Sequence, residues 1–593
     1  MKSNKLPSWD LSDLYKGTND AGINKDLEKF RKLNKDLEKK YKGKIAGLKA
    51  EEFFGAVKIY EEMSIISHVL GAFAYLNMAT QMNNPEATAF YQDISEKLTD
   101  YSMPSVFFSL EINQLPDSKI KEFLSNKDVK TYSPWVKRIR MFKKHELSEE
   151  AESIFLEKNV TSGSAWVRLY DEKSVELKYI VNGKEYNDSE IYLLVQDKNK
   201  EIRHKAGAEI NKVCKENASL FAFIYNMIIK DKAIENNKRS FKTPMSSMCL
   251  ANNVEDDVVN ILADSVKDNY AKIAHRFYKL KAKWLGVKKI SYWDRNAPLP
   301  FEEDTKYSWE QSVQIVLDAY KKFSPKLYNL ALDFFDKDWV DAPTRNGKRS
   351  GAFAHPVSSS KHPYLFLNFT GRQRDVLTLA HELGHGCHMR LSHKQGELQD
   401  DTPLTLAEVA SVFAESLTFK KLLGDTDNDK LKLCLIAAKV NDMINTAIRQ
   451  ISFHFFEKKA HDERKNGELS IEKLSQIWQE ELKASLGECV EIDNAEYVWS
   501  EVSHFFHVPF YVYAYSFADC VVNSLYSVYQ EGGVKGFEDK YLTLLSETGV
   551  KKYDVLLKPF GLDAKDKDFW NKGLSVISGY IDELERLDKK LKL

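Results

Sequence analysis

The sequence predicts a mostly α-helical protein with two helical lobes around a deep cleft and a small β element beside one functional helix. Charged amphipathic segments, typical of helices, fill residues 1 to about 170 and resume from Asp197. The chain has 593 residues. Because one hydrophobic core seldom serves a chain of this length, we expect at least two lobes.

A change of pattern marks the first strands. Apolar and charged residues alternate from Val175 to Val181, and Asn182-Gly183 follows, which is a strong signal for a tight hairpin. We therefore expect residues 1–200 to form an N-terminal helical lobe with a strand hairpin near 175–187. Residues 201–593 should form the second, catalytic domain.

A few short strands should interrupt the helices of this second part. The candidates are residues 288–293, 351–353 and 364–368. The last of them runs almost directly into a helix, whose start is indicated by a capping-box pattern from Thr370 to Gln373. An edge strand beside that helix could pair with an extended peptide backbone.

The helix carries the sequence His381-Glu382-Leu383-Gly384-His385. Histidines at i and i+4 project from one side of a helix, so both imidazoles can bind one Zn²⁺. Glu382 then addresses a water molecule at the metal. Glu408, which follows His385 by 23 residues, supplies a third ligand. This set predicts one zinc ion per chain, with a fourth position open for water.

Residues 405–419 have apolar side chains at helical spacing and carry Glu408 and Glu415 two turns apart. One of these carboxylates can bind the metal while the other orients a histidine. His388 lies on the same face as the two histidines of the motif. Residues 381 and 388 are about 10 Å apart along a helix, too far to share one metal. We therefore expect His388 to support the site without binding zinc.

The alternative interpretation is that His381 and His385 are ordinary helix residues and that Glu408 is a solvated charge. The helix is otherwise apolar around the motif. Because buried ionisable groups need partners or a metal, this environment favours the metal site.

A second cluster of histidines and phenols occupies residues 504–515. Pro509 suits the first turn of a helix, on which positions 507, 511 and 515 would form one stripe. Such groups can donate hydrogen bonds to a developing oxyanion, although an aromatic core stripe is the alternative. The candidates are His504, His507, Tyr511, Tyr513 and Tyr515.

The composition excludes several classes of partner. The chain has 86 basic and 87 acidic residues and a net charge of -1, so no global field attracts nucleic acid or a membrane. The N-terminus lacks the apolar run of a signal peptide, and six cysteines show no CxxC pair or disulfide density. We expect a cytoplasmic protein with reduced thiols, and its oligomeric state stays open.

The segments HELGHGCH and LAEVASVFAE resemble the oligoendopeptidase F branch of the thimet oligopeptidase family of zinc metallopeptidases. Residues 6–11, 349–353, 368–371 and 560–570 are similar to other parts of that family, so the resemblance covers nearly the whole chain. It implies a zincin-like fold with a deep substrate cleft that admits short oligopeptides.

The resemblance also assigns roles to individual residues. It implies that His381, His385 and Glu408 bind zinc, that Glu382 is the catalytic base, and that Glu415 is an acid beside a ligand. It implies a substrate-binding edge strand at Gly351, Ala352 and Phe353. In relatives, a histidine and tyrosines of the region that matches residues 504–515 contact substrate, which makes His507 a candidate for substrate binding.

We therefore predict a zinc endopeptidase that hydrolyses internal bonds of oligopeptides through an activated water, with Glu382 as general base. One alternative is a zinc exopeptidase of carboxypeptidase or dipeptidyl-carboxypeptidase type on the same core. The other alternative is a catalytically silent, peptide-binding scaffold, against which the intact Glu382 argues.

Overall fold

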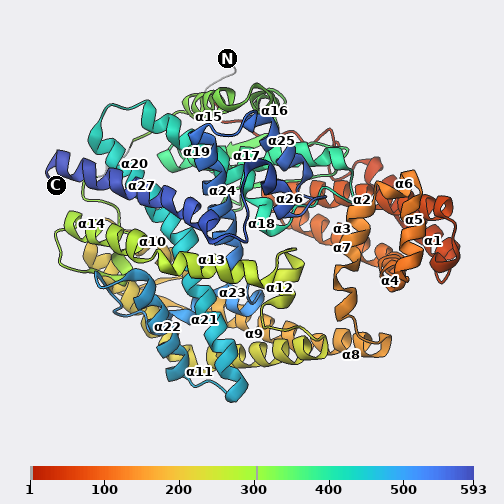
Figure 1. Cartoon of the computed structure of the whole chain (residues 1–593), viewed down its shortest axis with the longest axis horizontal. Coiled ribbons are helices and arrows are strands. Elements are labelled where there is room, and N and C mark those ends of the chain that lie inside the picture. Colours follow the sequence, from red (N-terminus) through yellow and green to blue (C-terminus); the bar gives the residue numbers. More distant parts are fainter. Residues whose placement is uncertain (1–4, 302–304) are drawn as a thin grey trace. The chain divides into compact units, whose positions relative to one another are not determined.

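The computed structural model describes residues 5–301 and 305–593 and is mainly α-helical, which confirms the predicted class (Figure 1). The chain forms two compact units, each assembled from three segments. The first unit comprises Met1–Lys144, Asp304–Gly424 and Gly533–Gly561. The second comprises His145–Glu303, Asp425–Gly532 and Leu562–Leu593. These units are compact bodies that each combine distant segments, so they do not test the boundary at residue 200 between the N-terminal lobe and the catalytic domain. That boundary stays a prediction.

The first unit begins with the helices coloured red to orange in Figure 1. They are α1 (Ala21–Tyr41), α2 (Ala50–Ala79), α3 (Pro85–Ser102), α4 (Val106–Gln114), α5 (Asp117–Ser125), α6 (Lys127–Lys130) and α7 (Ser133–Ile139). In α1, Ile23, Leu27 and Phe30 recur at helical spacing and are buried. Phe53 of α2 stacks on Phe123 of α5, with ring centroids 4.2 Å apart. The apolar faces of these helices thus share one core.

The remaining helices of the first unit surround the motif. They are α15 (Trp309–Phe323), α16 (Pro325–Asp336), α17 (Gln373–Ser392), α18 (Leu404–Ala407), α19 (Val409–Gly424), α25 (Phe537–Glu547) and α26 (Tyr553–Leu557). The hydroxyls of Ser308 and Ser324 cap α15 and α16 by accepting backbone N–H groups of the first turn. Helix α17 packs against α15, α16, α19 and α25, so the motif lies at the centre of this unit.

A three-stranded sheet lies beside α17. Its strands are β4 (Val340–Pro343), β5 (Phe353–His355) and β6 (Tyr364–Phe369), in the order β4-β6-β5. Strand β6 is parallel to β4 and antiparallel to β5, and both β5 and β6 pack against α17. The predicted strand at 364–368 is confirmed. The strand predicted at 351–353 begins only at Phe353, because Gly351 adopts a left-handed conformation with φ +84°.

The second unit is also built mainly from helices (Figure 1). They are α8 (Glu149–Asn159), α9 (Gly163–Glu176), α10 (Asp188–Leu194), α11 (Lys200–Lys238), α12 (Ser246–Ala251), α13 (Asp256–Asp268), α14 (Arg276–Trp284), α20 (Asp429–Met443), α21 (Arg449–Glu463), α22 (Ile471–Leu486), α23 (Ser503–His507), α24 (Tyr513–Glu531) and α27 (Lys567–Leu591). Two π-helical segments, Ala271–His275 and Ile444–Ile448, lead into α14 and α21. Helix α24 packs along α27, and α21 along α22.

The second unit contains two small strand pairs. The hairpin of β1 (Tyr179–Val181) and β2 (Lys184–Tyr186) lies at the predicted place and turns at Asn182 and Gly183, which both have positive φ. It is shorter than the alternation suggests, because α9 continues to Glu176. Strand β3 (Ile290–Ser291) pairs in parallel with β7 (Val490–Glu491). The strand predicted at 288–293 stops there, since Ser291 caps a 3₁₀ turn.

Two further observations concern the whole chain. Within the described ranges, no helix has the length and the apolar character needed to span a membrane. All six cysteines are free thiols.

Candidate metal centre

Helix α17 begins at Gln373 with Arg372 as its N-cap, two residues later than the cap that the sequence predicts at Thr370. The carboxylate of Asp375 accepts hydrogen bonds from the Thr370 hydroxyl at 2.8 Å and from the Arg372 N–H at 3.1 Å. Asp375 therefore takes the capping role that the pattern assigned to Gln373. The negative charge also suits the positive end of the helix dipole.

His381, His385 and Glu408 come together, with their ligand atoms all within 4.8 Å of one another. The Nε2 atoms of the two histidines are 3.2 Å apart, and Glu408 Oε2 lies 3.3 Å from each of them. Tetrahedral zinc with ligand bonds of 2.0–2.1 Å requires ligand atoms about 3.3 Å apart. Two imidazoles and one carboxylate at this spacing therefore fit a zinc ion with one position left open.

Glu408 lies between two helices, which corrects the continuous helix predicted over residues 405–419. Helix α18 ends at Ala407 and α19 begins at Val409. The Ser411 hydroxyl donates a hydrogen bond of 2.7 Å to the Glu408 carboxylate. Burial raises the pKa of Glu408, but hydrogen bonding and attraction to the histidines outweigh it and lower the pKa to about 2. Glu408 is therefore a fixed anion beside both imidazoles.

Glu415 contacts the Nδ1 side of the His381 ring, while Glu408 faces its Nε2 side. Its carboxylate lies 2.6 Å from His381 Nδ1, so it can accept the Nδ1–H and leave Nε2 directed at Glu408. Burial lowers the pKa of His381, but the hydrogen bond to Glu415 and the nearby carboxylates raise it to about 9. Glu415 thus fixes the orientation of the ring that a metal would need.

Glu382 is buried beside this triad, with 6% of its surface exposed. Burial raises the pKa of its carboxyl, while His381 and His385 oppose that shift. A backbone hydrogen bond from Ala354 of β5 also favours the charged form. The carboxyl therefore lies next to the edge strand as well as to the histidines, in surroundings that make it basic.

The edge strand and its lead-in are held by β6. Strand β5 is the last strand in the order β4-β6-β5 and pairs with β6 through Phe353 and its neighbours. Ahead of the strand, Asn368 Nδ2 donates to the carbonyl oxygens of Arg349 at 2.9 Å and of Gly351 at 2.8 Å. Ala352 lies in this extended lead-in, outside the strand. The Asn368 amide therefore anchors the backbone through which residues 351–353 would meet a peptide.

His388 is buried one turn further along α17. Its Nε2 lies 2.9 Å from the Thr548 hydroxyl. Burial lowers the pKa of His388 to about 4, so the ring is neutral. His388 does not belong to the group of potential metal ligands, and its supporting role stays a prediction.

The residues of the 504–515 cluster belong to the second unit, and they do not form the single helical stripe that the sequence predicts. Helix α23 ends at His507 and α24 begins at Tyr513, with Phe510 between them at φ +65°. The structure instead groups three side chains. His504 Nε2 lies 3.1 Å from the Tyr515 hydroxyl, and the Tyr511 and Tyr515 rings are 5.3 Å apart.

The two other candidates lie apart from this group. Tyr513 is fully buried, and its hydroxyl accepts a 2.9 Å hydrogen bond from Asn252 Nδ2. His507 Nε2 pairs with Asp171 at 2.6 Å and its ring packs edge-on against Tyr170. Tyr513 therefore has a place in the core, whereas His504, Tyr511 and Tyr515 contact one another.

Glu457, which was not predicted from the sequence, holds the turn between α23 and α24. Its Oε1 accepts the Phe510 N–H at 2.8 Å, and its Oε2 is buried without a partner. Burial raises the pKa of Glu457 to about 8. His454 and His461 lie three and four residues away on α21 and are also buried. Three ionisable residues spaced three and four positions apart among phenylalanines are the sequence signal that could have pointed to this buried group of His454, Glu457 and His461.

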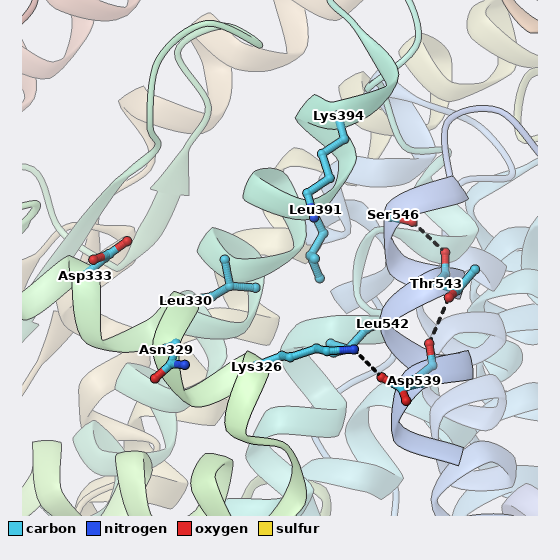
Figure 2. A pocket seen from close by; sticks show the side chains of 10 residues that line it. All are labelled: Lys326, Asn329, Leu330, Asp333, Leu391, Lys394, Asp539, Leu542, Thr543 and Ser546. Carbon is cyan, nitrogen blue, oxygen red and sulfur yellow. Dashed lines mark hydrogen bonds and ion pairs between the residues drawn. The ribbon is translucent and has the colours of Figure 1, made fainter. Parts of the chain in front are cut away.

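A separate surface pocket of ≈ 610 Å³ lies in the first unit between α16, the end of α17 and α25 (Figure 2). Its rim carries an ion pair between Lys326 and Asp539, 2.6 Å apart and largely exposed. Figure 2 shows that none of the triad residues lines it. The pocket is therefore distinct from the candidate metal centre.

The chain is similar to known peptidases along most of its length. The family model described as peptidase family M3 matches residues 193–576, and the model described as Oligopeptidase F matches residues 111–179. Oligopeptidase PepF of Bacillus subtilis is 24% identical and covers 100% of this chain and 90% of its own length. An oligoendopeptidase F homolog of Borreliella burgdorferi is 26% identical, over 98% of each chain.

A solved structure shares the fold. The crystal structure of oligoendopeptidase-F from Enterococcus faecium superimposes with a TM-score of 0.70 at 20% identity, covering 95% of this chain and 99% of that one. The family models and the oligoendopeptidase F relatives indicate a metalloendopeptidase. The chain belongs to peptidase family M3, since that family model covers well over half of its residues.

Proposed function

We propose that this metalloendopeptidase binds one Zn²⁺ through His381, His385 and Glu408 and hydrolyses internal bonds of oligopeptides. The mutual distances of 3.2–3.3 Å among the three donor atoms carry the proposal. The hydrogen bond from His381 to Glu415 supports it, because the ring is already oriented for ligation. Family M3 and the oligopeptidase names of the relatives support the substrate class.

Glu382 is the proposed general base. When bound, zinc supplies a Lewis acid that polarises the scissile carbonyl and lowers the pKa of water. Glu382 accepts a proton from the attacking water and returns it to the departing amine. Its burial raises its proton affinity, which suits both steps. No covalent enzyme intermediate is needed.

The remaining roles concern the substrate. A peptide backbone can pair with the edge strand at Gly351, Ala352 and Phe353, which leaves specificity to the length and conformation of the chain. The phenols of Tyr511 and Tyr515, with His504, are the proposed donors to the oxyanion. His507 is the proposed substrate contact from the end of α23.

The decisive experiment replaces the base alone. Glu382→Gln should retain zinc, measured by metal analysis of the purified protein, and lose nearly all cleavage of a quenched fluorescent peptide. Glu86→Gln, an exposed glutamate in the first turn of α3, is the matched control and should keep both properties. Ordinary turnover by Glu382→Gln would remove the assignment of the base.

The endopeptidase and exopeptidase alternatives differ in their need for a free terminus. A short peptide blocked at both ends should be cleaved at an internal bond, with the products identified by mass spectrometry. Cleavage only after one end is unblocked would indicate an exopeptidase. A stably folded globular domain should resist the enzyme, and its rapid proteolysis would contradict a preference for oligopeptides.

A further inference from the structure

A small cavity in the second unit carries two arginines and no acid. It lies between α14, the turn after β3, the start of α21 and the end of α22. Its lining includes two phenol rings and two guanidinium groups, from Tyr278, Tyr292, Arg295 and Arg449. Isoleucines, leucines and two serines complete the lining. None of its described lining residues is an aspartate or a glutamate.

Arg295 is the more enclosed of the two cations, with 6% of its surface exposed. Its Nη1 donates to the Tyr292 carbonyl oxygen at 2.8 Å, and its guanidinium stacks 3.7 Å above the centre of the Tyr292 ring. Its Nε is buried and has no hydrogen-bond partner. A buried guanidinium with an unused donor is costly unless a further group compensates it.

Arg449 also has a guanidinium donor without a partner. Its Nη2 makes a long contact of 3.4 Å to the Tyr292 hydroxyl, and its Nε is also buried without a partner. No ion pair joins either arginine to a carboxylate within the described ranges. Burial lowers the pKa of Arg295, and repulsion by the like charge of Arg449 acts in the same direction. Two arginines, each with a buried N–H that has no partner, thus line one cavity that has a net positive charge.

We propose that this cavity binds a small monovalent anion of the halide class, with chloride as the physiological form. The anion accepts hydrogen bonds from the guanidinium groups of Arg295 and Arg449 and neutralises part of their charge. The cavity of ≈ 10 Å³ holds about one water-sized particle. Phosphate, sulfate and peptide carboxylates are too large for it. Water fits but leaves both charges uncompensated.

The site has a structural role within the second unit. Arg449 is the first residue of α21 and directly follows the π-helical segment Ile444–Ile448, while Arg295 follows the 3₁₀ turn after β3. An anion between them ties these elements together. Because it binds the folded chain and not the unfolded one, it raises stability by mass action.

Thermal unfolding of the full chain tests this proposal independently of peptidase activity. Tm is measured in increasing sodium chloride or bromide, with sodium gluconate keeping the ionic strength constant. We expect Tm to rise with the logarithm of halide concentration, because only the folded state binds. A Tm that does not change when halide replaces gluconate overturns the proposal.

Variants then locate the effect. Arg295→Gln and Arg449→Gln should each lose the halide-dependent rise in Tm. Arg586→Gln is the control and should retain it, because Arg586 is an exposed residue of α27 that pairs with Glu583. A rise that both cavity variants retain overturns the proposal, since halide then binds elsewhere. If neither variant folds, anomalous diffraction from bromide in crystals of the unmodified protein decides. A peak between the two arginines supports the site, and its absence overturns it.

Discussion

Gly384 of the motif lies directly against the backbone of Ala410. A Cβ atom at Gly384 would lie 2.8 Å from the Ala410 carbonyl oxygen, closer than a real Cβ contact allows. This close approach brings the first turn of α19 against α17, immediately after Glu408. The glycine between the two histidines therefore sets how near Glu408, the proposed third ligand, can come to them.

We expect Gly384→Ala to push α19 away from α17 and to weaken zinc binding. Overpacking of this kind costs about 1–3 kcal/mol of stability, while alanine returns about 1 kcal/mol of helix propensity. Because these two effects on stability partly cancel, the clearest expected change is weaker zinc binding, measured by titration with a competing chelator. Gly579→Ala is the matched control, because Gly579 is an exposed residue of α27 with open space around its Cα. Unchanged zinc affinity in Gly384→Ala would contradict this account of the motif.

The two glutamates near His381 should respond differently to substitution. Glu408→Ala removes a proposed ligand and should abolish stable zinc binding at low free metal. Glu415→Ala removes only the group that orients His381 and should weaken zinc about 10- to 100-fold. Competition with a chelator measures both affinities. If Glu408→Ala keeps full zinc and Glu415→Ala loses it, Glu415 is the ligand.

The three tyrosines of the 504–515 cluster should differ in the property that their substitution changes, because their surroundings differ. Tyr511→Phe or Tyr515→Phe should lower kcat by about 10²- to 10³-fold if that phenol donates to the oxyanion. KM and zinc content should change little, because the contact forms mainly in the transition state. If both variants stay within a few-fold of the parent in kcat, roughly the limit for a lost oxyanion donor, the donor lies elsewhere.

Tyr513→Phe should act on stability instead. Its hydroxyl is buried and accepts a hydrogen bond from Asn252, so its loss should cost about 1–3 kcal/mol of unfolding free energy. Denaturant unfolding measures this cost, and kcat per folded molecule should stay close to the parent value. A large loss of kcat without loss of stability would place Tyr513 among the catalytic groups.

Glu457 should make stability depend on pH. In the unfolded chain a glutamate titrates at its ordinary pKa of 4.5, whereas burial raises the pKa of folded Glu457 to about 8. The folded state therefore keeps a proton that the unfolded state has already released. The stability from this group is complete below pH 4.5 and is lost as the pH rises through 8.

Glu457→Gln removes this dependence, since an amide does not titrate. Relative to the parent, the variant should gain roughly 4–5 kcal/mol of unfolding free energy between pH 4 and pH 9. Urea unfolding at the two pH values gives the difference. Glu216→Gln, at an exposed position of α11, should show no such gain. Equal behaviour of both variants would mean that Glu457 ionises in the folded chain as it does in water.

The sequence determined those features that depend on local spacing. Two histidines four residues apart share one face of any α-helix, so His381 and His385 had to converge once α17 formed. The presence of α17, the mostly α-helical class and the Asn182-Gly183 hairpin follow from the same local rules of periodicity and turn chemistry. The apolar pattern on either side of Glu408 also placed helices correctly, and only their continuity was wrong.

Tertiary structure decided what depends on distant segments. The break at Glu408 accompanies the packing of α19 against Gly384, which no pattern within residues 405–419 expresses. The turn at Phe510 is held by Glu457, 53 residues earlier, and it separates phenols that one continuous helix would have aligned. Side chains far apart in the sequence compete for the same volume and the same hydrogen bonds, and only the folded chain settles that competition. Local spacing therefore determined which residues could bind a metal, and long-range packing determined how they are held.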